Sequence, residues 1–321
     1  MMKALVTGGT GFVGNGVVDL LLQNGHSVRL FSRRRELPER LKGKDAEIFH
    51  GDLRDFPSVV SAMDKMDVFF HIGEIKNFSQ TASLNNIKLM EHIIAGVRQK
   101  EVKRLVFISS ITVAGIPSET PADENTEPKA ILEDHYTSYK RACERLIMSS
   151  CSCEFVIIRP APVYGPRSRH MGGFITTIDR LGPIGFPFIG NAENLAPLIY
   201  VKDVANAIYL SGLSPSAKGQ VLNLTDGFRH SWLDFLTAIA ELLGKKLRII
   251  AIPPLLLKIP AVPLDILSGL IGIKVDPLQY VNYFSNDLFF DNSRSKAVLN
   301  WQPEFSLKDG VKEMIKFYRG S

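Results

Sequence analysis

The sequence contains little cysteine, with three residues of this type among 321. They stand at positions 143, 151 and 153, an odd and sparse set without the spacing of metal ligands. This scarcity argues against a disulfide framework and against a zinc site or other metal site. Cys151 and Cys153 form a C-x-C pair, which we interpret as ordinary thiols in a reducing compartment.

Long uninterrupted apolar runs are also missing. The most apolar stretch, Ile249–Ile273, is broken by four prolines and contains a lysine and an aspartate. A membrane-spanning helix needs about twenty nearly uninterrupted apolar residues, so this stretch does not predict one. No charged and then apolar leader precedes the first apolar run, Lys3–Val6. We therefore expect a cytoplasmic protein without a transmembrane segment, and peripheral contact with a membrane stays open.

Charge of one sign is not concentrated. The net charge is +5, and the basic residues are dispersed apart from Arg33, Arg34 and Arg35. A nucleic-acid groove is therefore not indicated. A composition of 45% apolar and 22% charged residues is typical of a soluble globular protein. The expected partner is a small-molecule substrate, and a homodimer stays open.

Short apolar runs alternate with helical patterns in the first half of the chain. This rhythm predicts a parallel sheet with helices on both faces, a Rossmann-type doubly wound α/β fold. The expected strands are Lys3–Val6, Ser27–Phe31, Glu47–His50, Val68–Ile72, Arg104–Ile108 and Phe155–Arg159. The expected helices are Phe12–Gln23, Phe56–Met63, Leu84–Gln99 and Tyr136–Met148.

After Gly165 this rhythm breaks, and the glycines and prolines of Gly172–Pro197 predict a loop. Ile199–Leu210 and Val221–Leu224 indicate a return to the first domain, whereas Trp232–Leu243 and Leu307–Tyr318 suit a second one. A chain of 321 residues is long enough for one large domain and one small one. We expect a dinucleotide-binding domain of residues 1–165 and 198–228, and a substrate domain of residues 166–197 and 229–321.

A glycine-rich loop lies between the first expected strand and helix. Gly9, Gly11 and Gly14 fit the pattern G-x-G-x-x-G. Gly8, Gly11 and Gly14 fit the pattern G-x-x-G-x-x-G. Residues without Cβ let the chain turn tightly and let a pyrophosphate approach the backbone at the helix N-terminus. In this strand–loop–helix context the loop predicts a dinucleotide site made of Gly8, Thr10, Gly11, Phe12, Val13 and Gly14.

The end of the second strand indicates the cofactor. NAD-binding proteins usually carry an acid there to bond the ribose 2′-hydroxyl, but this sequence has Ser32 followed by Arg33 and Arg34. A hydroxyl and guanidinium groups bind a 2′-phosphate, which a carboxylate would repel. We predict NADP rather than NAD. The alternative is that these arginines only form a solvated face.

Asp52 and Leu53 follow the third strand, and we expect them to contact the adenine. Asp52 can accept a bond from the adenine amino group. An equally good interpretation is a helix N-cap, which applies to Asp55 as well.

Tyr136 and Lys140 stand four residues apart on an expected helix, so their side chains share one face. A nearby cation lowers the pKa of a phenol, and the tyrosine can then exchange a proton with an alcohol or a carbonyl. Ser110 follows the strand Arg104–Ile108, at the sheet edge where ligands bind, and can polarise the substrate oxygen. The alternatives are a chance spacing and a turn serine, while Tyr139 is expected to pack.

These motifs occur in the order typical of the extended short-chain dehydrogenases/reductases, which the chain resembles over nearly its whole length. Further matches are Arg159–Pro166, Tyr200–Ala205, Gly219–Asn223 and Ser295–Pro303. The resemblance implies that Ser110, Tyr136 and Lys140 form the catalytic triad and that Lys140 also binds the nicotinamide ribose. It also implies that the backbone from Pro160 to Val163 lies near the nicotinamide.

Three departures from the family pattern stand out. Asn86 is kept, but the Gly-Thr that often follows in Asn-x-x-Gly-Thr is replaced by Leu89-Met90. The usual Val-Tyr-Gly after the serine reads Val113-Ala114-Gly115. His71-Ile72-Gly73-Glu74 replaces a common His-Leu-Ala-Ala and puts an acid near the cofactor. The sequence leaves the roles of Asn86 and Glu74 open.

The substrate class is the last question. Sugar-nucleotide enzymes of this superfamily often carry an arginine shortly before the C-terminal Ser-Lys-Ala, but residues 283–290 contain none. The apolar substrate half resembles the hydroxysteroid dehydrogenase and dihydroflavonol reductase branch. We expect an NADP-dependent oxidoreductase of an apolar alcohol or ketone. The alternatives are a sugar-nucleotide epimerase or dehydratase, with Arg248 or Arg294 on the diphosphate, and a non-catalytic NADP-binding sensor.

Overall fold

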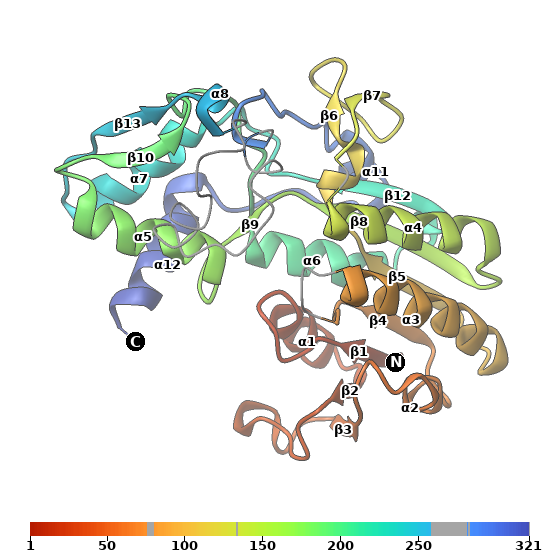
Figure 1. Ribbon diagram of the computed structural model, residues 1–321. Helices are drawn as coiled ribbons and strands as arrows, with labels where there is room; N and C mark the ends of the chain where they lie inside the picture. Colours follow the sequence, from red (N-terminus) through yellow and green to blue (C-terminus); the bar gives the residue numbers. More distant parts are fainter. Residues whose placement is uncertain (76–79, 133, 258–280, 282, 321) are drawn as a thin grey trace.

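A computed structural model describes residues 1–75, 80–132, 134–257, 281 and 283–320. Its centre is a seven-stranded parallel sheet in the order β12-β8-β5-β4-β1-β2-β3 (Figure 1). The strands are β1 Lys3–Thr7, β2 Ser27–Ser32, β3 Ala46–His50, β4 Val68–His71, β5 Arg104–Ile108, β8 Glu154–Pro160 and β12 Gln220–Leu224. This is the doubly wound Rossmann arrangement, so the predicted fold class is confirmed.

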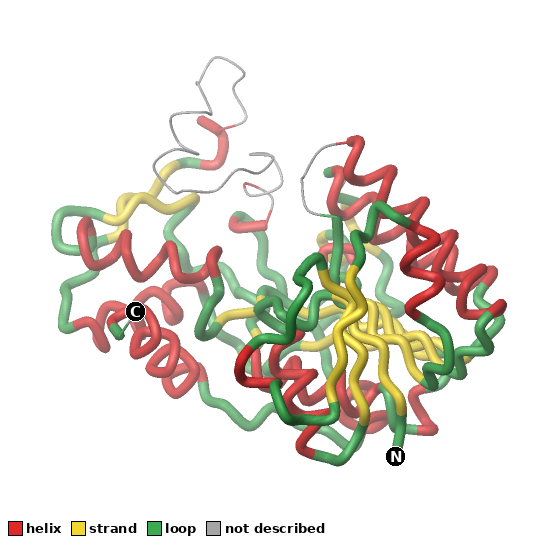
Figure 2. The backbone as a smooth tube through the Cα atoms, turned by 90° about the horizontal axis from the view of Figure 1, so that it is seen from below, coloured by secondary structure: helices red, strands yellow, loops and turns green. Residues whose placement is uncertain are grey.

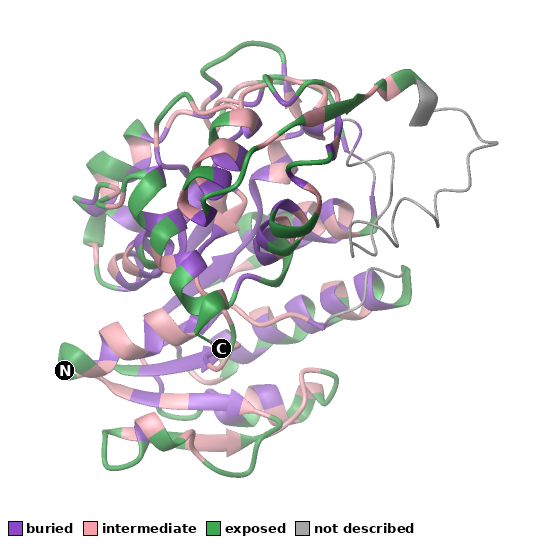
Figure 3. Cartoon of the chain, turned by 90° about the vertical axis from the view of Figure 1, so that its left-hand side faces the viewer, coloured by how far each residue is buried: buried purple, intermediate pink, exposed green. Residues whose placement is uncertain are grey.

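Both faces of the sheet are covered by helices. Ala4 and Val6 of β1 point into one core and Leu5 into the other, because successive strand residues face opposite sides. Helices α1 Gly14–Gln23, α6 Val201–Ser211 and α11 Ser293–Leu299 cover the first face, and α2 Phe56–Ala62, α3 Gln80–Gln99 and α4 His135–Ser150 cover the second. Figure 3 shows the central strands buried between these layers.

The direction of winding reverses between β1 and β4. From β1 the chain proceeds to β2 and β3 on one side, and then returns to β4 and β5 on the other. The loops at the carboxyl ends of β1 and β4 therefore diverge and leave a crevice, the usual ligand site of such sheets.

A second lobe lies beside the carboxyl ends of the strands (Figure 2). It contains α5 Arg169–Leu181, β10 Phe186–Ile189, α7 Trp232–Leu243, β13 Ile249–Ile252, α8 Pro254–Leu257 and α12 Leu307–Arg319. All of these except α8 contribute to a separate apolar core around Trp232, Phe235 and Val311. A capping box between Ser231 and Asp234 begins α7 where the sequence predicted. The domain boundaries expected from the sequence stay a prediction.

The predicted loop over Gly172–Pro197 is wrong in its first half. Residues 169–181 form helix α5, capped by Ser168, and Phe186–Ile189 form β10. Gly172 marks close packing rather than a turn, because a Cβ there would lie 2.3 Å from the ring of Tyr318. The segment Ile199–Leu210 likewise divides into β11 Ile199–Tyr200 and α6.

Smaller elements complete the chain. They are β6 Ile116–Pro117, β7 Pro128–Ala130 and β9 Val163–Tyr164, with 3-10 turns η1 Glu39–Leu41, η2 Ile111–Ala114 and η3 Pro215–Ala217. Of the apolar stretch Ile249–Ile273, residues 258–273 lie outside the described part of the chain. Within the described part, no helix combines the length and apolarity needed to cross a membrane.

Candidate active site

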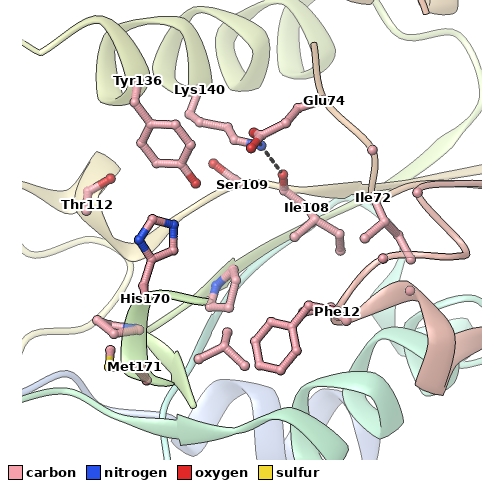
Figure 4. A pocket seen from close by; sticks show the side chains of 18 of the residues that line it. Phe12, Ile72, Glu74, Ile108, Ser109, Thr112, Tyr136, Lys140, His170 and Met171 are labelled. Carbon is pink, nitrogen blue, oxygen red and sulfur yellow. Dashed lines mark hydrogen bonds and ion pairs between the residues drawn. The ribbon is translucent and has the colours of Figure 1, made fainter. Parts of the chain in front are cut away.

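A cavity of about 470 Å³ opens at the carboxyl ends of the strands, between the sheet and the second lobe. Its size falls within the range of small-molecule sites. Figure 4 shows the side chains that converge on it. The lining comes from the ends of β1, β4, β5 and β8 and the loops that follow them, from α4 and from the second lobe: Gly8, Gly11–Gly14, Ile72–Glu74, Ile108, Ser109, Thr112, Tyr136, Lys140, Pro160, Pro162, Val163, His170, Met171, Phe174, Trp232, Tyr283 and Phe284.

The glycine loop forms one end of this cavity. Gly8 adopts a φ of +70°, and a Cβ on Gly14 would lie 2.2 Å from the Gly8 carbonyl oxygen. Only glycine fits this approach of loop and helix. Helix α1 begins without a side-chain cap and without an acid in its first turn. Its positive dipole end can therefore bind an anion. Of the predicted loop residues, Thr10 alone does not line the cavity.

The residues expected at the 2′-phosphate lie at the end of β2, outside the cavity lining. Ser32 Oγ accepts a hydrogen bond of 3.1 Å from the Arg34 backbone N–H. Arg33 and Arg34 are exposed, and neither guanidinium forms an ion pair with any described carboxylate. These two cations are thus available to a ligand.

Asp52 and Leu53 follow β3, also outside the cavity lining. Asp52 Oδ1 accepts a bond of 2.9 Å from the Arg54 N–H, and Leu53 packs against the core under α2 and α3. The N-cap of α2 is Asp55, whose side chain accepts from the Ser58 N–H. The helix-cap interpretation therefore applies to Asp55, and the predicted adenine contact of Asp52 stays a prediction.

Helix α4 directs Tyr136 and Lys140 into the cavity. Asp134 caps the helix by accepting from the Thr137 N–H. Lys140 is 4% exposed, its Nζ donates to the Ile108 carbonyl at 2.8 Å, and it lies 5.6 Å from the centre of the Tyr136 ring. The helical spacing expected from the sequence thus brings a phenol and a cation together.

Tyr136 is held by a short chain of hydroxyl groups. It hydrogen-bonds to Ser110, whose Oγ accepts a 2.9 Å bond from Thr112 Oγ1, which in turn accepts from Thr137. Burial raises the pKa of Tyr136 strongly and the charge of Glu74 raises it further, whereas the bond to Ser110 lowers it. The phenol is therefore protonated at neutral pH in the absence of a ligand.

The two neighbouring serines after β5 have different positions: one caps a turn, and the other lines the cavity. Ser110 begins η2 as its N-cap and reaches Tyr136, but it does not line the cavity. Ser109 lines the cavity, and its buried hydroxyl has no hydrogen-bond partner among the described residues. Sequence reasoning singled out Ser110 and gave Ser109 no role.

Sequence reasoning also missed the walls that the second lobe contributes. His170, Met171 and Phe174 enter the cavity from α5, and Trp232 from the start of α7. A spacing of three to four residues in 170–174 indicates one helix face. That signal was hidden by the prediction of a loop.

Asn86, whose role the sequence left open, holds the loop after β4. Its Oδ1 accepts from the Ile75 N–H at 2.9 Å, and its Nδ2 donates at 3.0 Å to the carbonyls of Ile75 and Ala82. Asn86 therefore fixes the backbone beside Glu74, and it does not line the cavity.

The two arginines considered for a diphosphate do not line this cavity. Arg294 Nε lies 3.3 Å from Glu124 Oε2, and Arg248 is exposed beside β13. Cys151 and Cys153 lie at the far end of α4, with their sulfurs 3.4 Å apart. No group of three or more potential metal ligands occurs in the described part of the chain.

Comparison with known proteins gives a consistent picture. A sequence model described as the NAD dependent epimerase/dehydratase family matches residues 4–224. The chain is 24% identical to the 2-alkyl-3-oxoalkanoate reductase of Shewanella oneidensis, over 97% of this chain and 85% of the relative. It is 24% identical to a 3-beta-hydroxysteroid dehydrogenase of Mycolicibacterium neoaurum, over 98% and 91% of the two chains. The UDP-glucose 4-epimerase of Thermus thermophilus in complex with NAD matches with a TM-score of 0.76 and 22% identity, over 100% of both chains.

Proposed function

The chain belongs to the NAD dependent epimerase/dehydratase family and is an NAD(P)-dependent enzyme, and from this premise we propose that it is an NADP-dependent oxidoreductase of an apolar ketone or alcohol. One observation carries the proposal. The second lobe lines the cavity with Met171, Phe174, Trp232 and Phe284, and no described arginine lines it.

The energetics of the two substrate classes differ in such a cavity. Apolar surface removed from water gains about 25 cal/mol for each Å². A diphosphate gains nothing from these walls, and burying its charges without partners costs several kcal/mol. Lys140 is the only described lysine or arginine that lines the cavity, and its Nζ already bonds to Ile108. The walls therefore favour a ring or chain of hydrocarbon.

The residues available for NADP fit the parts of that molecule. The uncapped N-terminus of α1 would bind the pyrophosphate, and Ser32, Arg33 and Arg34 the 2′-phosphate. Asp52 and Leu53 would flank the adenine, and Lys140 the nicotinamide ribose, with Pro160 and Val163 beside the nicotinamide. When bound, the cofactor supplies or accepts the hydride.

The chain's own residues would manage the proton. In reduction, the Tyr136 hydroxyl gives its proton to the carbonyl oxygen of the substrate while Ser110 hydrogen-bonds to the phenol. Ser109 offers a hydroxyl without a described partner at the same end of the cavity. Phe12, Met171 and Phe174, which line the cavity, would exclude water around the reacting carbon.

Ligand binding and turnover test this proposal together. The NADP-loaded protein is titrated by calorimetry with uridine diphosphate and with a ring-bearing apolar ketone, and NADPH consumption is followed with sterol-like, flavonoid-like and nucleotide-sugar compounds. We expect binding and turnover of the apolar ketones and weak binding of the nucleotide. Micromolar binding of uridine diphosphate that Arg248→Ala or Arg294→Ala abolishes would instead establish a sugar-nucleotide enzyme. Cofactor binding without any turnover would point to a sensor.

A further inference from the structure

A carboxylate lies beside the ammonium group of the candidate active site. Glu74 Oε2 is 3.5 Å from Lys140 Nζ and accepts a hydrogen bond from the Tyr139 hydroxyl. The Glu74 side chain is 28% exposed, and Figure 4 shows it over Lys140 at the cavity wall. This acid stands where the sequence departs from the usual family pattern.

The backbone on both sides of Glu74 is fixed. The Gly73 N–H donates to the carbonyl and hydroxyl oxygens of Thr7, at 3.1 and 3.0 Å, and both backbone groups of Ile75 bond to Asn86. A Cβ on Gly73 would lie 2.9 Å from the Gly8 backbone N. The pairing of Glu74 with Lys140 is therefore a property of the fold and not of a free surface side chain.

The carboxylate changes the charge around Tyr136. A lone lysine would favour the phenolate, whereas Glu74 beside Lys140 brings the net charge of the pair to zero. Among the described residues, the other groups near the phenol are Asp134, which caps α4, Tyr139 of α4 and the hydroxyl of Ser110. Thr112 and His170 lie on the same side of the cavity (Figure 4). His71 of β4 is neutral, because burial lowers its pKa to about 3. Among the described residues, Lys140 is thus a cation beside the Tyr136 ring, and Glu74 is the carboxylate that pairs with it.

We propose that Glu74 neutralises Lys140 and holds Tyr136 in its protonated form, so that the site carries a proton donor for carbonyl reduction. This rests on the proposed oxidoreductase function. In reduction the substrate carbonyl carbon would gain a hydride from the reduced nicotinamide cofactor, its oxygen would gain the Tyr136 proton, and water would return a proton to the phenolate. Glu74 acts through Lys140 and Tyr136, and is a positioning residue.

The test follows the ionisation of Tyr136 directly, without turnover. Tyrosines carry ¹³C at Cζ, whose NMR shift reports the phenolate, and the Tyr136 signal is assigned by its loss in Tyr136→Phe. The NADP-loaded protein is titrated from pH 6 to 10.5 as wild type and as Glu74→Gln, which keeps size and removes charge. We expect the wild-type signal to stay that of the phenol. In Glu74→Gln the ionisation should move down by about one pH unit or more, so that the signal begins to shift toward that of the phenolate at the upper end of this range and does so at lower pH than in wild type.

Two matched variants separate charge from packing. Glu74→Asp keeps the carboxylate, and Tyr139→Phe removes only the hydroxyl that donates to it. In both variants the NMR signal of Tyr136 should remain that of the protonated phenol over the whole pH range. A Tyr136 signal that stays unchanged in Glu74→Gln would overturn the inference. So would an equal change in Tyr139→Phe.

Kinetics with a turned-over ketone and its alcohol complete the test. The pH midpoint of alcohol oxidation should fall by about one unit in Glu74→Gln, as expected if the ionisation of Tyr136 moves by that amount. If no ketone or alcohol is turned over, the proposed function fails. The NMR titration still decides whether Glu74 controls Tyr136.

Discussion

The guanidinium group of Arg159 binds both carboxylate oxygens of Glu144, with Nε to Oε1 at 3.0 Å and Nη2 to Oε2 at 2.6 Å. Glu144 lies one helical turn after Lys140 on α4, and Arg159 directly precedes Pro160 at the cavity. This bidentate pair ties the helix that carries Tyr136 to the strand that leads into the cavity wall. The Glu144 side chain is 2% exposed, so the pair is largely shielded from solvent.

Removing one partner of this pair should destabilise the fold. Glu144→Ala leaves the guanidinium of Arg159 without its counter-ion in a largely buried place, which costs about 3–5 kcal/mol. Urea unfolding of wild type and variant measures the loss. The double variant Glu144→Leu with Arg159→Met should recover most of it, since neither charge then remains. A loss below about 1 kcal/mol in the single variant would show that the pair contributes little.

Tyr136→Phe should abolish most turnover. The substitution keeps the ring and removes the exchangeable proton, so kcat should fall by about a hundredfold or more while NADP binding changes little. Steady-state kinetics and cofactor titration measure the two effects. Tyr139→Phe, which removes the other phenol of α4, is the matched control. Near-normal turnover in Tyr136→Phe, together with a large loss of turnover in Tyr139→Phe, would show that Tyr139 and not Tyr136 exchanges the proton.

Arg33→Asp should change the cofactor preference. A carboxylate repels the 2′-phosphate and can accept a bond from a 2′-hydroxyl, so the affinity for NADP should fall at least tenfold and that for NAD should hold or rise. The ratio of the two dissociation constants is the measurement. Arg98→Asp makes the same charge change on the exposed end of α3 and should leave the ratio unchanged. An unaltered ratio in Arg33→Asp contradicts the role given to Arg33.

Asp226 should make stability fall as the pH rises. Burial raises its pKa to about 7, and its Oδ2 lies 3.4 Å from His230 Nε2, whose own pKa burial lowers. The unfolded chain releases this proton near pH 4. The folded protein therefore binds more protons between pH 4 and 7, and the free energy of unfolding declines through that window.

Asp226→Asn removes this titration and should flatten the pH dependence of stability. Urea unfolding at pH 5 and pH 8 should show that the free energy of unfolding of the variant, relative to that of wild type, is higher at pH 8 than at pH 5. Asp64→Asn, at an exposed aspartate that pairs with Lys100, should keep the wild-type slope. An identical slope in wild type and Asp226→Asn would mean that Asp226 is ionised in the folded protein throughout.

Local patterns in the sequence were enough to predict the architecture of the nucleotide-binding half. Alternating apolar runs identified six of the seven strands of the large sheet, and the glycine loop identified the turn before α1. The seventh strand, β12, lies where the sequence indicated only a return to the first domain. The Y-x-x-x-K spacing placed Tyr136 and Lys140 on one helical face. Each of these three predictions depends on the backbone geometry of a few consecutive residues, and local sequence patterns indicate that geometry.

Helix α5 was missed for a tertiary reason. Its glycines suggested a loop, but Gly172 is small because the ring of Tyr318 packs against it from 146 positions away. The sequence does not distinguish a glycine required for close packing from a glycine required for a turn, so it predicted a loop where a helix forms.

The contact between Glu74 and Lys140 also depends on tertiary structure. The two residues are 66 positions apart, and they come together because β4 and β5 are neighbours in the sheet and α4 packs beside α3. The sequence by itself thus determined the strands, the glycine turn and the residue types of the candidate site. The tertiary structure alone decided which of those charges stand within reach of one another, because ion pairing depends on distance through space and not on separation along the chain.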